Sequence, residues 1–86
     1  MHYVYIIYSK KLQKKYIGHT TNVKERVMQH KQGHTPFTSK AKDWALIYYE
    51  VFLSKKDAIE EEKFLKSGKG RERLKFLLDD TMKMIK

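Results

Sequence analysis

An arginine and a histidine stand four residues apart in this sequence, and together they could do chemistry on a phosphate group. Asn22 with Glu25 three residues later forms a helix-capping signal, which predicts a helix over residues 23–32. Residues four apart share one face of a helix, so Arg26 and His30 should lie side by side. A guanidinium suits a phosphate oxygen, and an imidazole can move a proton near neutral pH. Taken singly, His30 is more often a boundary residue with its hydrogen bonds satisfied, and Arg26 is more often an ordinary surface cation.

Glu62 is a carboxylate on the side of a predicted helix that should face the core. Ser54 and Asp57 form a second capping signal, and helical spacing over residues 58–66 puts Glu62 on the same face as Ala58. A carboxylate there is costly unless a cation, a metal or hydrogen bonds offset its desolvation, which makes it a functional candidate. The alternative is a rotated helix that leaves Glu62 at the core boundary, paired with a surface lysine.

Tyrosines are concentrated near the start of the chain, where four of the six fall within the first 16 residues. Strand alternation puts Tyr3 and Tyr5 on one face of the first predicted strand and Tyr8 on the other. Tyr16 belongs to a second β-prone run. Buried tyrosines commonly serve as core bulk with a tethered hydroxyl, and each of these residues alone favours that interpretation.

The strands that must position these residues are indicated by apolar runs. Residues 3–8 are apolar or aromatic at every position, which predicts a central strand with both faces buried. Residues 16–18 supply a second short strand, close enough to form a hairpin with the first, and residues 44–52 supply a third. We therefore expect a three-stranded antiparallel sheet.

The helices are expected to flank that sheet. Residues 33–43, which hold the only proline, predict an exposed basic loop. Gly68 and Gly70 are expected to interrupt the second helix, and a third follows over residues 71–78. The order strand, strand, helix, strand, helix, helix predicts the α+β class.

Length and composition limit what this chain can be. Its 86 residues, 41% of them hydrophobic, are enough for one core, so we expect a single domain over residues 1–80 and a frayed tail over residues 81–86. The absence of cysteine excludes disulfides, iron–sulfur clusters and thiol nucleophiles, and favours a cytoplasmic location. No apolar run approaches the length of a membrane span, so no membrane role is expected.

The charge balance indicates a polyanionic partner. Lys and Arg number 19 against 10 Asp and Glu, which leaves a net charge of +9. All but three of these cations are lysines, which suit phosphate contact better than the reading of bases. Nucleic acid is the partner this favours, and a merely soluble basic surface is the alternative.

Motifs taken in chain order resemble those of the GIY-YIG nuclease family: Tyr3-Val4-Tyr5, Tyr16-Ile17-Gly18, Arg26, His30 and Glu62. The segment Ser67-Gly68-Lys69-Gly70-Arg71 resembles the small stand-alone bacterial members, and the likeness covers residues 2–78. Tyr3 and Val4 replace the glycine and isoleucine of the first motif, while Tyr5 keeps its tyrosine. The resemblance gives Gly18 a structural role.

The resemblance also implies roles for the side chains. Glu62 would bind one divalent cation, Mg²⁺ or Mn²⁺, and Arg26 would stabilise the extra negative charge of a pentavalent phosphorane. Tyr5 would activate the attacking water with His30 accepting or relaying the proton, and Tyr16 would orient water and phosphate. Either Tyr5 or His30 could be the general base.

The expected activity is divalent-metal-dependent endonuclease cleavage of DNA, in DNA repair or recombination, with a protein partner as one source of specificity. Substrate grip is expected from basic residues: Lys14, Lys15, Lys24, Lys31, Lys40, Lys42, Lys66, Lys69 and Arg71. One alternative is a non-catalytic nucleic-acid-binding module with the same fold. Another is a protein-interaction module whose tyrosines and Glu62 are only core features.

Overall fold

The apolar run at the start of the chain forms the central strand of a three-stranded sheet. In the computed structural model, which describes residues 1–85, β1 (His2–Ser9) lies between β2 (Lys14–Thr20) and β3 (Ala45–Phe52). It pairs antiparallel with both neighbours. Residues 4–7 of this strand are all buried, as expected of a strand covered on both faces. The predicted α+β fold is confirmed.

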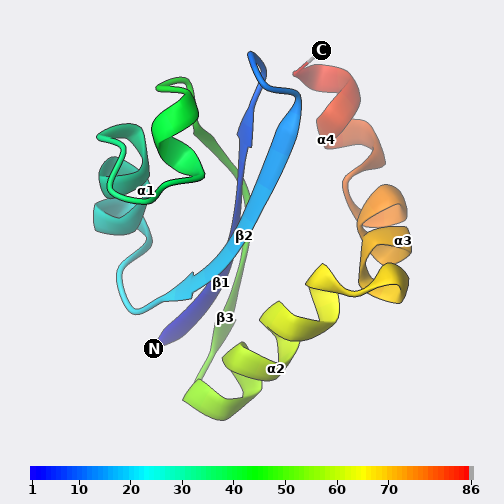
Figure 1. The fold of residues 1–86 in the computed structure, drawn as a ribbon. Helices are drawn as coiled ribbons and strands as arrows, with labels where there is room; N and C mark the ends of the chain where they lie inside the picture. Colours follow the sequence, from blue (N-terminus) through cyan, green and yellow to red (C-terminus); the bar gives the residue numbers. More distant parts are fainter. Residues whose placement is uncertain (86) are drawn as a thin grey trace.

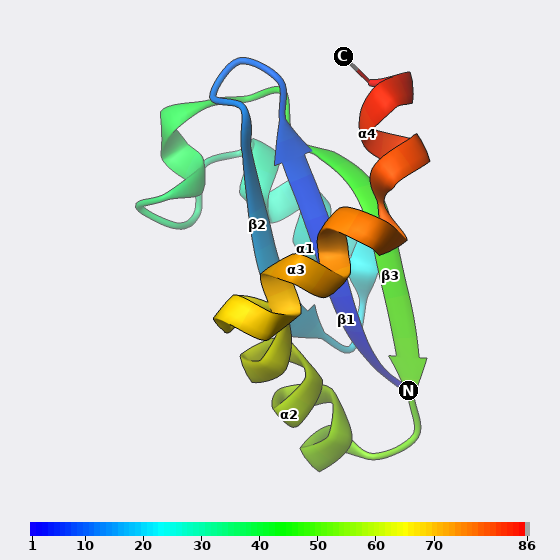
Figure 2. The ribbon, with the colours of Figure 1, turned by 90° about the vertical axis from the view of Figure 1, so that its right-hand side faces the viewer.

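Helices cover the two faces of the sheet, as Figures 1 and 2 show. On one face lie α1 (Val23–Lys31) and the short 3₁₀ helix η1 (Thr38–Lys40). On the other lie α2 (Lys55–Lys66), α3 (Gly68–Leu77) and α4 (Asp79–Met84). The sheet is therefore the middle of three layers.

The alternation of β1 divides the core into two clusters. Even-numbered residues of the strand face α2 and α3, in a cluster of six buried side chains: Val4, Ile6, Ala58, Leu65, Leu74 and Leu78. Odd-numbered residues face α1 and η1, in a smaller cluster: Tyr5, Ile7 and Trp44. Tyr5 is thus an aromatic member of the smaller cluster, beside the first helix.

The capping signals act as the sequence predicts. The side chain of Asn22 accepts a hydrogen bond from the backbone N–H of Glu25, and the side chain of Ser54 accepts one from that of Asp57. Gly33, at a φ of 78°, lies just past the end of α1 in the left-handed region that favours glycine. These caps fix where α1 and α2 begin, and hence which side chains each helix turns inward.

The loop before β3 differs from the prediction of an exposed segment. Within residues 33–43, η1 and its flank bury Thr38 and Ala41. The indole Nε1–H of Trp44 donates to the backbone oxygen of Thr38 at 2.9 Å. The polar composition of the loop could not reveal this, because the partners of Thr38 come from β3's flank and from α1.

Helix α2 ends at Lys66, just before Gly68 and Gly70, as predicted, but both glycines lie in the first turn of α3, which begins three residues earlier than the expected helix over residues 71–78. Ser67 caps that turn, with its hydroxyl accepting from the Gly70 N–H at 3.2 Å. A Cβ at Gly70 would lie 1.9 Å from the backbone oxygen of Phe64. Glycine is needed here so that α3 can approach the end of α2 closely.

The end of the described chain is helical where a frayed tail was expected over residues 81–86. Met82, on α4, packs against the larger core cluster, which gives the short helix a tertiary anchor. Residue 86 of the predicted tail lies outside the described residues. No helix within residues 1–85 is both long and apolar enough to cross a membrane.

Candidate functional site

The two strands of the hairpin place Tyr5 and Tyr16 on the same face of the sheet. Tyr5 pairs with Gly18 across the hairpin, and Tyr16 pairs with Ile7. The ring of Tyr5 lies over Gly18 so closely that a Cβ there would be 2.6 Å from the Tyr5 hydroxyl oxygen. The absence of a side chain at Gly18 therefore leaves the room that the Tyr5 hydroxyl occupies over the edge strand β2.

Helix α1 brings His30 against both tyrosines. His30 is fully buried, and its Nε2 lies 2.6 Å from the hydroxyl oxygen of Tyr5. The rings of Tyr16 and His30 are 4.7 Å apart between centroids. A tyrosine hydroxyl and a histidine nitrogen at this distance form a strong, directed hydrogen bond inside the protein.

Arg26 lies one turn before His30 on the same helix. Its Nη1 donates to Oε1 of Gln29 at 2.8 Å. A hollow of about 120 Å³, lined in part by Arg26 and Gln29, opens beside it at the surface. The guanidinium is half-buried and open to a small anion from that side.

Burial sets the protonation of the Tyr5–His30 pair. Desolvation, with the nearby charge of Arg26 adding to it, lowers the pKa of His30 to about 4. Desolvation also raises the pKa of Tyr5 to about 12, although the neighbouring Arg26 acts to lower it. At neutral pH the phenol is protonated and the imidazole is neutral. A phenol O–H is a stronger donor than an imidazole N–H, and an unprotonated imidazole nitrogen is a stronger acceptor than a phenol oxygen, so the favoured hydrogen bond runs from Tyr5 O–H to Nε2 of His30.

Glu62 approaches the edge strand from the opposite face of the sheet. Its carboxylate contacts Nδ1 of His19, which follows Gly18 on β2, and accepts from Nζ of Lys66 at 2.5 Å. Partial burial alone would raise the pKa of Glu62, but the hydrogen bonds from Lys66 and His19 hold it below its ordinary value. Glu62 is ionised at neutral pH, and it makes the lysine pairing that the alternative interpretation foresaw.

The two halves meet at β2, which is an edge strand of the sheet formed by the described residues. Four of the residues singled out from the sequence lie on the α1 face: Tyr5, Tyr16, Arg26 and His30. The negative charge of Glu62, on α2, nevertheless contributes to the raised pKa of Tyr5. A ligand lying along the β2 edge could face both halves at once.

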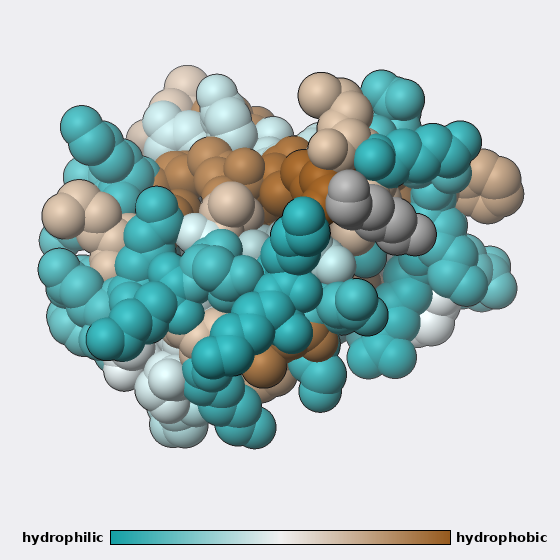
Figure 3. Space-filling model, turned by 90° about the horizontal axis from the view of Figure 1, so that it is seen from above, coloured by the Kyte–Doolittle hydropathy of each residue, from teal (hydrophilic) through white to brown (hydrophobic). Residues whose placement is uncertain are grey.

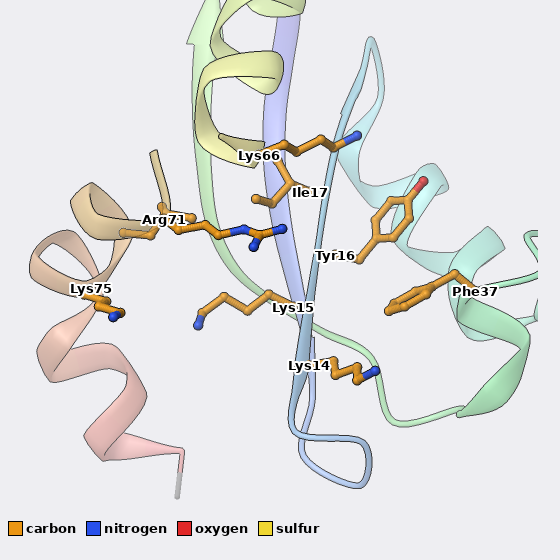
Figure 4. Close-up of a pocket in the computed structure, with 9 residues that line it drawn as sticks. Lys14, Lys15, Tyr16, Ile17, Phe37, Lys66, Arg71 and Lys75 are labelled. Atoms are coloured by element: carbon orange, nitrogen blue, oxygen red, sulfur yellow. The ribbon is translucent and has the colours of Figure 1, made fainter. Parts of the chain in front are cut away.

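A groove of about 610 Å³ runs along the same edge (Figure 4). Tyr16 and Phe37 line it from the α1 side, and Ile17 and Leu74 supply apolar floor. In Figure 4 the side chain of Lys66 extends across the line of β2 toward the side that carries Tyr16. Five cations surround the groove: Lys14, Lys15, Lys66, Arg71 and Lys75. Their charge favours a polyanion beside Tyr16, which packs against His30.

The basic residues predicted from the sequence are all exposed but do not share one surface. Lys24 and Lys31 line a separate hollow between α1 and β3, and Lys40 and Lys42 line another near Asp43. Hydrophilic residues also cover much of the face seen in Figure 3. Of the remaining five, Lys14, Lys15, Lys66 and Arg71 border the β2 groove, and Lys69 lies exposed in the first turn of α3 without lining it.

Sequence analysis missed four side chains that the structure joins to the site: His19, Thr35, Thr38 and Lys75. Two signals could have found His19 and Lys66 as contacts of Glu62. Strand alternation turns His19 to the face opposite Gly18, toward α2. Helical spacing puts Lys66 one turn after Glu62.

The residues at Glu62 fit a hard divalent cation. Within residues 1–85 no group of three or more His, Asp or Glu side chains lies close enough to enclose a metal. Mg²⁺ does not need such a cage, because it commonly binds one or two carboxylates and keeps several waters. The ionised carboxylate of Glu62, whose side chain is 16% exposed, meets that requirement.

Comparisons with known proteins agree with these motifs. A family described as the GIY-YIG catalytic domain matches residues 1–75. UPF0213 protein SH2523 of Staphylococcus haemolyticus is 35% identical over 77 residues, which cover 88% of this chain and 93% of the relative. A UPF0213 protein of Limosilactobacillus reuteri is 37% identical over 89 residues, covering 99% and 91%. The solution NMR structure of UPF0213 protein BH0048 from Bacillus halodurans has a TM-score of 0.54 at 33% identity, covering 88% of this chain and 83% of that one.

Proposed function

The chain belongs to the GIY-YIG family, and from that premise we propose that it is a divalent-metal-dependent endonuclease that hydrolyses phosphodiester bonds in DNA. The observation that carries the proposal is the hydrogen bond between Tyr5 and the buried, neutral His30 at 2.6 Å. A proton acceptor so placed, beside an arginine and a basic groove, suits attack by water on a phosphate.

His30 is the proton acceptor in this proposal, and Tyr5 lies between it and the attacking water. Because burial raises the pKa of Tyr5 to about 12, its phenol holds its proton at neutral pH and cannot act as a base by itself. Tyr5 passes its proton to Nε2 of His30 while the Tyr5 oxygen takes a proton from the attacking water. The water becomes the nucleophile, and the proton ends on His30.

Arg26 and Glu62 act on the phosphate in complementary ways. The guanidinium of Arg26, open to the surface beside α1, stabilises the added negative charge of the pentavalent phosphorane. Glu62 holds the divalent cation, Mg²⁺ or Mn²⁺, which when bound neutralises charge at the scissile phosphate and the leaving oxygen. Tyr16, packed against His30, orients the water and the phosphate.

The groove along β2 holds the flanking phosphates. Its cations are mostly lysines, which contact phosphate without reading bases. Selectivity would then come from the structure of the DNA or from a protein partner, which suits DNA repair or recombination. Lys24, Lys31, Lys40, Lys42 and Lys69 extend the basic surface beyond this groove.

The experiment is a cleavage assay on nicked, branched, single-stranded and supercoiled DNA, with Mg²⁺, Mn²⁺ or a chelator. We expect strand scission that requires the cation and is lost in Glu62→Gln. Glu60→Gln is the matched control, because Glu60 lies on the same helix with its side chain 64% exposed. Scission that survives in Glu62→Gln, or that ignores the chelator, contradicts the proposal.

A second candidate is a non-catalytic nucleic-acid-binding module. It is favoured by one observation: both oxygens of Glu62 are already engaged, one by His19 and the other by Lys66. Salt-sensitive DNA binding without scission, equal in the wild type and Glu62→Gln, would support this candidate in place of the nuclease.

A further inference from the structure

Thr38 holds the second nitrogen of the imidazole that faces Tyr5. Its hydroxyl oxygen lies 3.1 Å from Nδ1 of His30, and both residues are fully buried. The same hydroxyl lies 2.5 Å from that of Thr35. The loop before β3 thus supplies His30 with a polar partner on the side away from Tyr5.

The hydrogen bonds of this cluster can run in two directions, and one of them is favoured. Because a phenol O–H is a stronger donor than an imidazole N–H, the favoured direction has Tyr5 donating to Nε2 of His30, which is then unprotonated. The single proton of the neutral imidazole is then on Nδ1, and Nδ1–H donates to Thr38. The Thr38 hydroxyl, which accepts from Nδ1–H in this arrangement, can then donate its own proton to the Thr35 hydroxyl.

The backbone around Thr38 fixes the position of its hydroxyl. Its carbonyl oxygen accepts from the indole of Trp44 at 2.9 Å, and its N–H donates to the Thr35 hydroxyl at 3.2 Å. Trp44 is itself 1% exposed and belongs to the core cluster of Tyr5. Such anchoring is more than an isolated surface threonine requires, and it points to a role in holding the imidazole.

We propose that Thr38 is a positioning residue that keeps the proton of His30 on Nδ1, so that Nε2 stays free to take a proton from Tyr5. The hydrogen bond made by one imidazole nitrogen decides which nitrogen is protonated. Without the hydroxyl, Nδ1–H has no partner in a buried site, which favours the proton on Nε2, where it prevents Nε2 from accepting a proton from Tyr5. The catalytic consequence rests on the proposed function, but the tautomer does not.

The test combines an NMR readout with a cleavage readout. Imidazole ¹⁵N shifts report directly which nitrogen of His30 carries the proton. In Thr38→Val we expect the Nδ1 signal to move from its protonated position toward the unprotonated one. The turnover rate should fall about tenfold or more with little change in KM, as for other outer partners of functional histidines. Thr38→Ser, which keeps the hydroxyl, should restore both, and Thr81→Val on α4 is the matched control.

Thr38→Ala serves if Thr38→Val does not fold, because it removes the hydroxyl without placing a methyl group beside Nδ1. An Nδ1-protonated His30 in a folded Thr38→Val or Thr38→Ala overturns the inference. So does a Thr38→Ser protein that behaves like Thr38→Val. Should the wild type cleave no DNA, the proposed function fails, and the ¹⁵N shifts alone then decide the role of Thr38.

Discussion

The two halves of the candidate site are built on opposite principles. On the α1 face, Tyr5 and His30 are buried and joined by a hydrogen bond of 2.6 Å. On the α2 face, Glu62 is partly exposed and paired with Lys66, whose side chain is 51% exposed. A buried neutral network is rigid, whereas a surface ion pair exchanges easily with water and ions. The first half is suited to moving a proton and the second to accepting a cation.

Glu62→Gln should therefore have the largest effect on activity and one of the smallest on stability. Losing the charge that holds the cation should lower the cleavage rate by at least about 100-fold. Because Glu62 is partly exposed and paired at the surface, we expect the midpoint of urea unfolding to change little. Single-turnover cleavage and urea unfolding measure the two effects. A large loss of stability with unchanged cleavage would contradict the proposed role of Glu62 as a cation ligand on the α2 face.

Tyr5→Phe should damage both activity and stability, unlike Glu62→Gln. Cleavage should fall about 100-fold or more, because His30 loses the group through which it takes a proton. The free energy of unfolding should fall by about 1–3 kcal/mol, because Nε2 of His30 is left buried without a partner. The same two assays apply, with Tyr49→Phe as the control since Tyr49 is 54% exposed. Full cleavage by Tyr5→Phe would remove Tyr5 from the proton path.

Much of the fold that positions the two halves of the site could be predicted from the sequence. The apolar run of residues 3–8 and the capping signals at Asn22 and Ser54 are local patterns, and the structure follows them. The glycines also predicted the end of α2, but not that Gly70 is needed for the close contact with Phe64 across the junction between α2 and α3. A local pattern cannot predict a position whose residue type is set by a contact with another element.

The site was less predictable than the scaffold. The residue types were indicated by motif, but the pairing of Tyr5 with His30 joins positions 25 apart and needs the sheet and α1 to be assembled. The burial of Thr38 also depends on the distant partners His30 and Trp44. Polar residues in a loop give no local signal of burial, so this part of the site emerges only from the structure.

Gly18→Ala tests whether the Tyr5 half depends on close packing. The new Cβ would lie 2.6 Å from the Tyr5 hydroxyl oxygen, so the buried ring must shift. We expect the free energy of unfolding to fall by about 1–3 kcal/mol and cleavage to fall with it. Gly68→Ala is the matched control, since a Cβ there meets nothing within 4 Å, and should be neutral or slightly stabilising. Equal effects of the two substitutions would contradict this account.

Protonation of the buried His30 should also make the stability of the protein depend on pH. His30 has a pKa of about 4 in the folded chain and an ordinary value of 6.5. Because its folded pKa is lowered, the unfolded chain binds the proton first as pH falls. The stability that His30 contributes is complete above pH 6.5 and declines between 6.5 and 4, by up to about 3 kcal/mol.

Urea unfolding of the wild type and His30→Gln from pH ~7 to ~4 isolates this contribution. The difference in free energy of unfolding between the two proteins should shrink as pH falls through that window. A difference that stays constant would mean that His30 takes up its proton equally well in the folded chain.

Lys66→Met should have the smallest effect of these substitutions, limited to cation binding on the α2 face. Removing the ammonium frees one oxygen of Glu62, so Mn²⁺ detected by electron paramagnetic resonance should bind about twofold more tightly. Stability should change by less than about 1 kcal/mol. Lys63→Met is the matched control, since Lys63 pairs with Glu60 and not with Glu62. Weaker Mn²⁺ binding in Lys66→Met would mean that the lysine helps the cation site instead of competing with it.

The most direct test of the central claim, that both halves serve one reaction, is a double-mutant cycle on the rate of DNA scission with Tyr5→Phe and Glu62→Gln. Groups that act as a unit are strongly non-additive. We expect the double variant to cleave no more slowly than the slower single variant. Losses that multiply, or a single variant that cleaves like the wild type, would contradict it.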